Sequence, residues 1–140
     1  MTYQTIYPYT NEVLATFDNA TEQDLEAALA KGHLLYKKWR QNALLAQRKE
    51  QLHQVAALLR RDLDKYAEIL TKDMGKLFTE AQGEVALCAD IADYYADKAE
   101  TFLQPRQLEA LHGQAYYVKQ ATGVLIAVEP WNFPFYQIMR

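Results

Sequence analysis

The sequence predicts an α/β protein in which several amphipathic helices precede a strand that is buried on both faces. Apolar residues recur at spacings of three and four along much of the chain before residue 105, which is the period of helices with one apolar face. The run 124–128 is aliphatic, partly β-branched and follows Gly123, as expected for a buried strand of a parallel sheet. Pro130 and Pro134 then impose a stiff, non-helical turn at the carboxyl end of this strand, where open α/β sheets bind ligands.

Composition limits the classes of function. The chain has 140 residues, of which 50% are hydrophobic and 24% charged, enough for one domain with a core. A net charge of −3, with no basic cluster larger than a Lys-Lys or Arg-Arg pair, argues against a nucleic-acid surface. The first residues lack the pattern of a signal peptide, and no apolar run approaches the ~20 residues that span a bilayer, so we expect no membrane association. A single cysteine excludes an intrachain disulfide and fits a reducing compartment, and we expect a cytoplasmic location.

The N-terminal part predicts a hairpin or a pair of short strands, followed by a helix. Residues 7–17 alternate apolar and polar side chains around Thr10 and Asn11, which favour a turn. Thr21 is a predicted N-cap with acidic residues after it. The apolar face of the helix that follows contains Leu25, Ala28, Leu29, Gly32, Tyr36 and Trp39.

Three further helices are predicted before residue 105. The second begins near Ala43 and the third ends at Gly75, with a break between them near residues 60–62 that the pattern does not fix. The fourth begins near Leu77 and is ended by Pro105. Its apolar stripe consists of Ala81, Val85, Cys88, Ala92, Tyr95, Ala99 and Phe102. Residues 114–120 then have the composition of a strand.

Most of the reactive side chains have a structural interpretation. Cys88 lies in the middle of a helical apolar stripe, where a cysteine behaves as a small, unreactive hydrophobic residue. The histidines are far apart and lack ligand spacing, so we predict no metal site; they are His33, His53 and His112. Four acidic residues are interpreted as helix-end or solvated charges rather than general bases: Glu22, Asp24, Glu80 and Glu84. Tyr36, Tyr66 and Tyr95 fall on helical stripes and are expected to pack in the core with the hydroxyl at its edge.

Asn132 is the strongest candidate for chemistry. An amide held rigidly in a turn at a sheet's carboxyl edge is a neutral hydrogen-bond donor, as stabilisation of a developing oxyanion requires. A structural alternative is that Asn132 caps a helix beginning at Phe133 or Pro134, since proline is common in the first turn of a helix. Both roles can hold together.

The turn Pro130-Trp131-Asn132-Phe133-Pro134 resembles the Pro-Trp-Asn-Phe-Pro motif of the NAD(P)-dependent aldehyde dehydrogenases. The resemblance extends over nearly the whole chain, in the same order. It includes Asn11-Glu12-Val13 with Ala15-Thr16-Phe17, Met74-Gly75-Lys76, Gly83-Glu84-Val85 and Gly123-Val124. The family commonly has glycine where Asn11 stands, and asparagine also tolerates a left-handed turn.

This resemblance implies a partial aldehyde dehydrogenase fold, in which N-terminal helices lead into the first strand of a Rossmann-like cofactor domain. Residues 1–105 would form the hairpin and the helical part, 106–122 an oligomerisation region, and 123–140 the first core strand with the asparagine turn. A strand in 116–120 would pair with another subunit of a homodimer or homotetramer. The alternative, a strand on this chain's own sheet, stays open.

The resemblance also implies a site. Asn132 would be catalytic, donating its amide to the oxygen of the bound aldehyde. Val128, Glu129, Pro130 and Trp131, together with Asn132, would line the nicotinamide side of an NAD or NADP site, mainly through backbone. Phe133 would border the aldehyde tunnel.

Arg140 points to a substrate class. Succinate-semialdehyde dehydrogenases, a branch of the family, are similar here, with an arginine eight positions beyond the asparagine that holds the substrate's distal carboxylate. The planar guanidinium binds carboxylates through two parallel hydrogen bonds. The alternative is a structural arginine in an aldehyde dehydrogenase for uncharged aldehydes.

In the family reaction, a cysteine thiolate adds to the aldehyde, hydride passes to NAD(P)+ and a glutamate-activated water releases the acid. The resemblance places that cysteine, that glutamate and the glycine signature for the cofactor later in the family's chain. We therefore expect residues 1–140 alone to be catalytically inert and poorly soluble, because a lone buried strand exposes its edges. The alternative of another class is a non-catalytic helical interaction module, which leaves the proline-bracketed turn unexplained.

Overall fold

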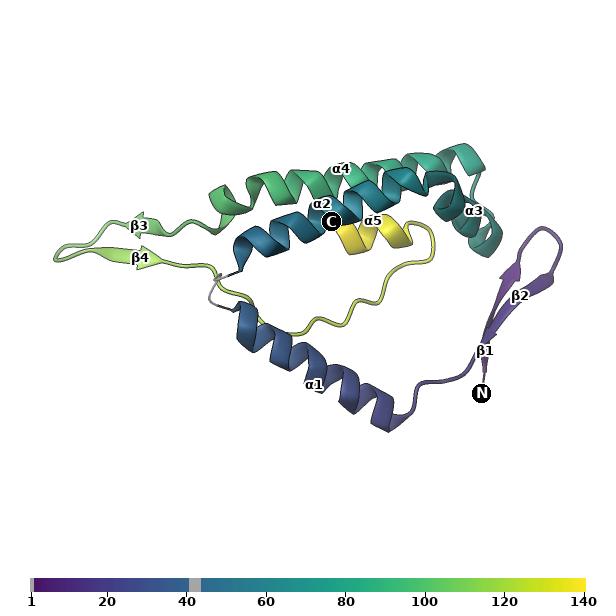
Figure 1. Ribbon diagram of the computed structural model, residues 1–140, viewed down its shortest axis with the longest axis horizontal. Helices are drawn as coiled ribbons and strands as arrows, with labels where there is room; N and C mark the ends of the chain where they lie inside the picture. Colours follow the sequence, from purple (N-terminus) through teal and green to yellow (C-terminus); the bar gives the residue numbers. More distant parts are fainter. Residues whose placement is uncertain (1, 41–43) are drawn as a thin grey trace.

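The computed structural model describes residues 2–40 and 44–140. It begins with an antiparallel hairpin, β1 (Tyr3–Tyr7) and β2 (Glu12–Phe17), which lies at one end of the molecule (Figure 1). Asn11 adopts a left-handed conformation with φ 59° in the connecting turn. The predicted hairpin and its turn are confirmed, and the first strand starts earlier than the predicted range.

Helix α1 (Glu22–Trp39) starts where the capping chemistry predicts. The backbone N–H of Asp24 donates to Thr21 Oγ1 over 3.1 Å, and the N–H of Thr21 donates back to Asp24 Oδ2 over 3.0 Å. None of the residues of α1 is buried, so the predicted apolar face is present without a complete cover among the described residues.

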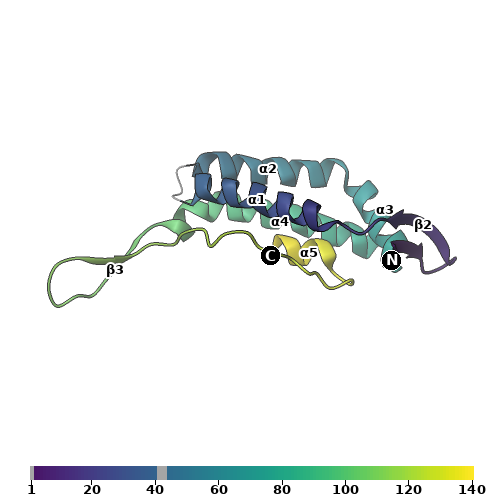
Figure 2. The same ribbon diagram turned by 90° about the horizontal axis from the view of Figure 1, so that it is seen from below.

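Helices α2 (Leu45–Arg61), α3 (Leu63–Met74) and α4 (Phe78–Leu103) form the core, with α2 and α4 side by side (Figures 1 and 2). The predicted start of the second helix at Ala43 lies outside the described residues. The break between α2 and α3 falls at Asp62, and Gly75 ends α3 with φ 78°. The core is built mainly from small side chains, which let the helices approach closely: Ala56, Ala67, Ala81, Val85, Cys88, Ala89 and Ala92.

A second hairpin projects beyond the end of α4 (Figure 1). Its strands β3 (Arg106–Leu108) and β4 (Ala115–Tyr117) are antiparallel. The strand predicted within 114–120 is confirmed as β4, and within the described chain it pairs with its own neighbour β3. β3 was not predicted, because its three residues lie directly after Pro105, two of them are polar, and they carry no strand signal.

The predicted buried strand at 124–128 is not formed. The segment is extended but unpaired, and the exposed fractions of its side chains reach 83% at Leu125 and 90% at Val128. An aliphatic composition favours burial, but a strand also needs neighbours to pair with, and no strand lies beside this segment within the described residues. Val124 of this segment packs against Gly32 of α1.

The chain ends in a short helix, α5 (Pro134–Met139), which packs against α4. Phe135, Tyr136 and Met139 of this region lie against the helical core. Within the ranges 2–40 and 44–140, no helix is both long and apolar enough to cross a membrane.

Candidate active site

The proline-bracketed turn lies between the extended segment and α5. Pro134 occupies the start of α5, and Phe133 precedes it with φ −142° and ψ 57°, outside the helical region. The exposed side chain of Asn132 makes no hydrogen bond to the described part of the chain, and no side chain at the cap position holds the helix. The interpretation of Asn132 as the cap of this helix is therefore wrong.

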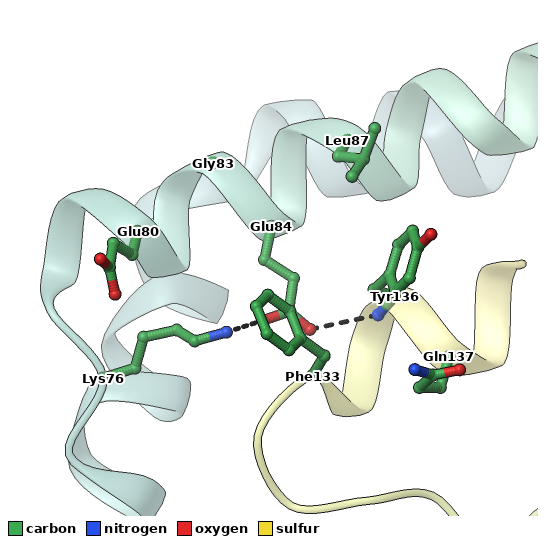
Figure 3. A pocket seen from close by; sticks show the side chains of 8 residues that line it. All are labelled: Lys76, Glu80, Gly83, Glu84, Leu87, Phe133, Tyr136 and Gln137. Carbon is green, nitrogen blue, oxygen red and sulfur yellow. Dashed lines mark hydrogen bonds and ion pairs between the residues drawn. The ribbon is translucent and has the colours of Figure 1, made fainter.

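The acceptor for the first turn of α5 comes instead from α4. Backbone N–H groups of Phe135 and Tyr136 both donate to Glu84 Oε1, each over 3.1 Å. Figure 3 shows the bond from Tyr136. Glu84 is only 4% exposed, so its interpretation as a solvated charge is wrong. A carboxylate at this position satisfies two N–H groups that a helix end leaves without intrahelical partners.

Lys76 is the counter-charge of Glu84. Its ammonium group donates to Glu84 Oε2 and lies 3.7 Å from the centroid of the Phe133 ring. Lys76 is 8% exposed, and a buried charge of this kind requires a partner. The lysine thus contacts both the carboxylate and the residue after Asn132. No periodicity or motif spacing signals this pair, because it depends on how the turn after α3 places Lys76 beside α4.

An open cleft of about 520 Å³ lies between α4 and the start of α5. Leu87 of α4 and the aromatic rings of Phe133 and Tyr136 face it, so much of its wall is apolar (Figure 3). The complete lining is Lys76, Glu80, Gly83, Glu84, Leu87, Phe133, Tyr136 and Gln137. The structure therefore places Phe133 at a cleft suited to a small organic molecule.

Arg140 directly follows α5, one turn beyond Tyr136, as the sequence predicts. Its Nη1 donates to the Tyr136 hydroxyl, and its guanidinium carbon lies 5.6 Å from the centroid of the same ring. The Tyr95 hydroxyl of α4 donates to the Arg140 carbonyl oxygen over 3.3 Å. Arg140 is exposed, so its remaining N–H groups are accessible to a ligand.

Cys88 lies in the core and is fully buried, as predicted. Burial, followed by the charge of the nearby Glu84, raises the pKa of the Cys88 thiol to about 11. A thiol with this pKa is almost entirely protonated near neutral pH and is a poor nucleophile.

The predicted cofactor residues form an exposed, extended stretch. Val128 is 90% and Trp131 74% exposed, while Glu129 is partly buried. Backbone hydrogen bonds between described residues do not involve residues 124–129.

His53 lies between α2 and α4 rather than at the cleft. Its Nδ1 is 2.7 Å from Asp93 Oδ1, and its Nε2 is 3.5 Å from Asp97 Oδ1. The described residues contain no group of three or more histidine, cysteine and acidic side chains that could hold a metal ion.

The turn that carries Asn132 and the helix α5 that Glu84 anchors form the candidate site. The sequence profile of the Aldehyde dehydrogenase family matches residues 1–140, and the chain belongs to this family.

Among individual members of the family, the chain is similar to succinate-semialdehyde dehydrogenases. The chain is 35% identical over 138 residues to a succinate-semialdehyde dehydrogenase [NADP(+)] of Deinococcus radiodurans, covering 99% of this chain and 29% of that protein. It is 37% identical over 143 residues to succinate-semialdehyde dehydrogenase [NADP(+)] 1 of Mycobacterium tuberculosis, covering 100% of this chain and 31% of that protein.

Among solved structures, it matches succinic semialdehyde dehydrogenase from Streptococcus pyogenes in complex with NADP+. The two are 74% identical, with a TM-score of 0.94 over 98% of this chain and 30% of that chain. This match shows that the described residues have the fold of the corresponding part of an aldehyde dehydrogenase. The chain spans less than a third of the length of each of these three proteins.

Proposed function

We propose that this chain acts as the N-terminal part of an enzyme that oxidises succinate semialdehyde to the dicarboxylate with NADP+. The observation that carries the proposal is the position of Arg140, directly after the short helix that begins at the asparagine turn. The turn and the short helix together thus carry an amide donor at one end and a guanidinium at the other. The three relatives described above are succinate-semialdehyde dehydrogenases, which supports the same substrate.

Asn132 is the proposed donor to the aldehyde oxygen. Its amide is exposed and not engaged by the described part of the chain, so it is available to a ligand. A hydrogen bond from a neutral amide strengthens as the oxygen gains negative charge. Loss of one such donor lowers kcat by about 10²–10³-fold in enzymes that stabilise an oxyanion.

Arg140 is the proposed partner of the distal carboxylate of the substrate. Its contact with the Tyr136 hydroxyl uses one N–H group and orients the guanidinium plane over the ring. The other N–H groups can bind both oxygens of a carboxylate. An uncharged aldehyde offers no such contact.

Residues Val128, Glu129, Pro130 and Trp131, with Asn132, are proposed to line the cofactor. When bound, NADP+ supplies the acceptor for the hydride of the substrate. The accessible backbone of this stretch would contact the nicotinamide side and fix its face toward the aldehyde. Cys88 is buried and protonated, so the nucleophile is proposed to lie outside residues 1–140.

A homo-oligomer is proposed from the β3–β4 hairpin. It projects from the helical layer, and the exposed fraction of Leu111 between its strands is 97% (Figure 1). A projecting two-stranded hairpin is marginally stable alone and gains partners when its edge joins another sheet.

The test is a steady-state assay of the complete protein with NADP+, comparing succinate semialdehyde with butanal, an uncharged aldehyde of the same chain length. We expect kcat/KM to be about 10- to 100-fold higher for succinate semialdehyde, because hydrogen bonds to a charged group contribute about 1.5–3 kcal/mol. Equal values for both substrates would favour an enzyme for uncharged aldehydes with a structural Arg140. Turnover of neither would favour the non-catalytic module.

A further inference from the structure

The buried pair of Lys76 and Glu84 connects the two elements on which the proposed chemistry depends. We propose that Glu84 and Lys76 are positioning residues, which fix the asparagine turn and α5 against α4 and thereby place Asn132 and Arg140 relative to each other. The inference rests on the proposed function.

Helix α5 needs an external anchor. It has only six residues and no side-chain cap of its own, and isolated helices of this length are unstable in water. Glu84 supplies the missing acceptor by binding the N–H groups of Phe135 and Tyr136 with one oxygen. Because Glu84 lies on the 26-residue helix α4, the position of α5 is set by the most extensive element of the core.

Lys76 extends this anchor to the turn itself. It follows the end of α3, binds the second oxygen of Glu84 and places its ammonium 3.7 Å from the centre of the Phe133 ring. Phe133 is adjacent to Asn132, so the cation limits the movement of the residue that carries the proposed donor. The pair joins three parts of the chain in a buried contact, and each of its charges depends on the other.

The geometry makes the two proposed site residues sensitive to this contact. A helix of six residues is about 9 Å long, so a tilt about its N-terminal end is carried to Arg140. Displacements of about 1 Å in a catalytic arrangement can lower the rate by about 10²-fold. Loss of the anchor should therefore affect kcat through Asn132 and KM through Arg140 together.

Two double variants of the complete protein separate anchoring from charge: E84L/K76M and E84Q/K76M. Both remove the buried ion pair and have side chains of similar size, but only glutamine retains an oxygen that can accept the N–H groups of Phe135 and Tyr136. For succinate semialdehyde we expect E84L/K76M to lose about 10²-fold in kcat/KM, with lower kcat and higher KM, and E84Q/K76M to lose about tenfold less.

Hydrogen exchange measured by mass spectrometry tests, without any substrate, whether Glu84 protects the backbone amides at the start of α5. In E84L/K76M, the amides of Phe135 and Tyr136 should exchange faster than in the parent, and in E84Q/K76M they should stay closer to it. E100Q is the matched control. Glu100 lies on the same helix as Glu84, α4, and its exposed ion pair with Lys49 of α2 is lost in this variant, away from α5. Its kinetics and its exchange at α5 should equal those of the parent.

The outcomes are distinguishable. A folded E84L/K76M protein with kcat and KM within about twofold of the parent would overturn the inference, since displacement of either site residue should cost more than that. A decrease in kcat by the same factor for every aldehyde, with KM unchanged, would also overturn the inference. That result is expected if the substitution only lowers the fraction of correctly folded enzyme. If E84L/K76M does not fold, E84D replaces it: the carboxylate is drawn back by one methylene, and unchanged kinetics and exchange would count against the proposal. If the parent oxidises no aldehyde, the proposed function fails, while the exchange of residues 135 and 136 still tests the anchor.

Discussion

The guanidinium of Arg140 lies over the Tyr136 ring and is held by its hydroxyl, with its outer edge accessible. Replacement by leucine keeps bulk near the ring but removes every N–H donor. In the complete enzyme, Arg140→Leu should raise KM for succinate semialdehyde about 10- to 100-fold and leave butanal almost unaffected. Steady-state kinetics with both aldehydes measure this difference.

Arg140→Lys is the matched control for charge. Lysine keeps the cation but loses the planar fork, so its KM for succinate semialdehyde should lie between those of the parent and Arg140→Leu. Equal effects of the leucine variant on both aldehydes would mean that Arg140 has only a structural role.

Between elements, α1 contacts the extended segment where Gly32 lies against Val124. A Cβ added to Gly32 would lie 2.8 Å from Cγ2 of Val124, which is too close for a branched side chain to absorb freely. Overpacking of this kind destabilises by about 1–3 kcal/mol, whereas alanine in place of glycine within a helix stabilises by about 0.5–1 kcal/mol.

The sign of the Gly32→Ala effect should therefore depend on Val124. In the complete protein, Gly32→Ala should lower the melting temperature, but in a Val124→Ala background the same change should be neutral or stabilising. Thermal melts of the four proteins of this double-mutant cycle measure the coupling. Additive effects would show that the two side chains do not meet.

Ion pairs between α2 and α4, made by His53 and Arg60 with Asp93, predict that stability depends on pH. A hydrogen bond from His53, followed by one from Arg60, lowers the pKa of Asp93 below its ordinary value. The folded protein therefore holds the Asp93 carboxylate ionised more strongly than the unfolded chain does. This stabilisation is complete above the unfolded pKa of 3.8 and is lost as the pH falls through the lower folded pKa.

Asp93→Asn removes the titrating group at nearly constant shape. Between about pH 5 and pH 2, the melting temperature of the parent should fall more than that of Asp93→Asn, and the two should converge at the acid end. Parallel curves over this range would show that the Asp93 contacts do not contribute to folding. Asp97→Asn is a control on the same helix face, since Asp97 is 3.5 Å from His53 and is not bonded to Arg60.

Local chemistry made some helix boundaries predictable. Thr21 marks the start of α1 through its capping box, and Gly75 ends α3 because it adopts a left-handed conformation. The Lys76–Glu84 contact was not predictable, since spacing alone does not distinguish a solvated glutamate from one that accepts two N–H groups of a distant helix. Neither was the state of residues 124–128, because composition encodes a preference for burial and says nothing about which neighbours provide it.

For the molecule as a whole, the exposure of residues 124–128 is the feature that most affects solubility and completeness of the fold. Leu125 is 83%, Ile126 79% and Val128 90% exposed, although this composition is typical of strands buried on both faces. The chain spans less than a third of its relatives, so we expect the remaining part of an aldehyde dehydrogenase to supply the neighbouring strands. Residues 1–140 alone should then aggregate, bind hydrophobic dyes and produce no reduced cofactor.

A single substitution should act in opposite directions in the two contexts. Ile126→Lys places a charge in the exposed segment 124–128 and should increase the soluble fraction of the isolated residues 1–140, because charges on exposed apolar segments oppose association. In the complete protein, the same lysine would be buried between helices and strands without a partner, and it should lower the melting temperature severely or prevent folding. Sedimentation of the isolated chain and thermal melting of the complete protein measure the two effects.

If the complete protein tolerates Ile126→Lys with an unchanged melting temperature, residues 124–128 do not form a buried strand there, and the Asn132 turn is not held by a sheet.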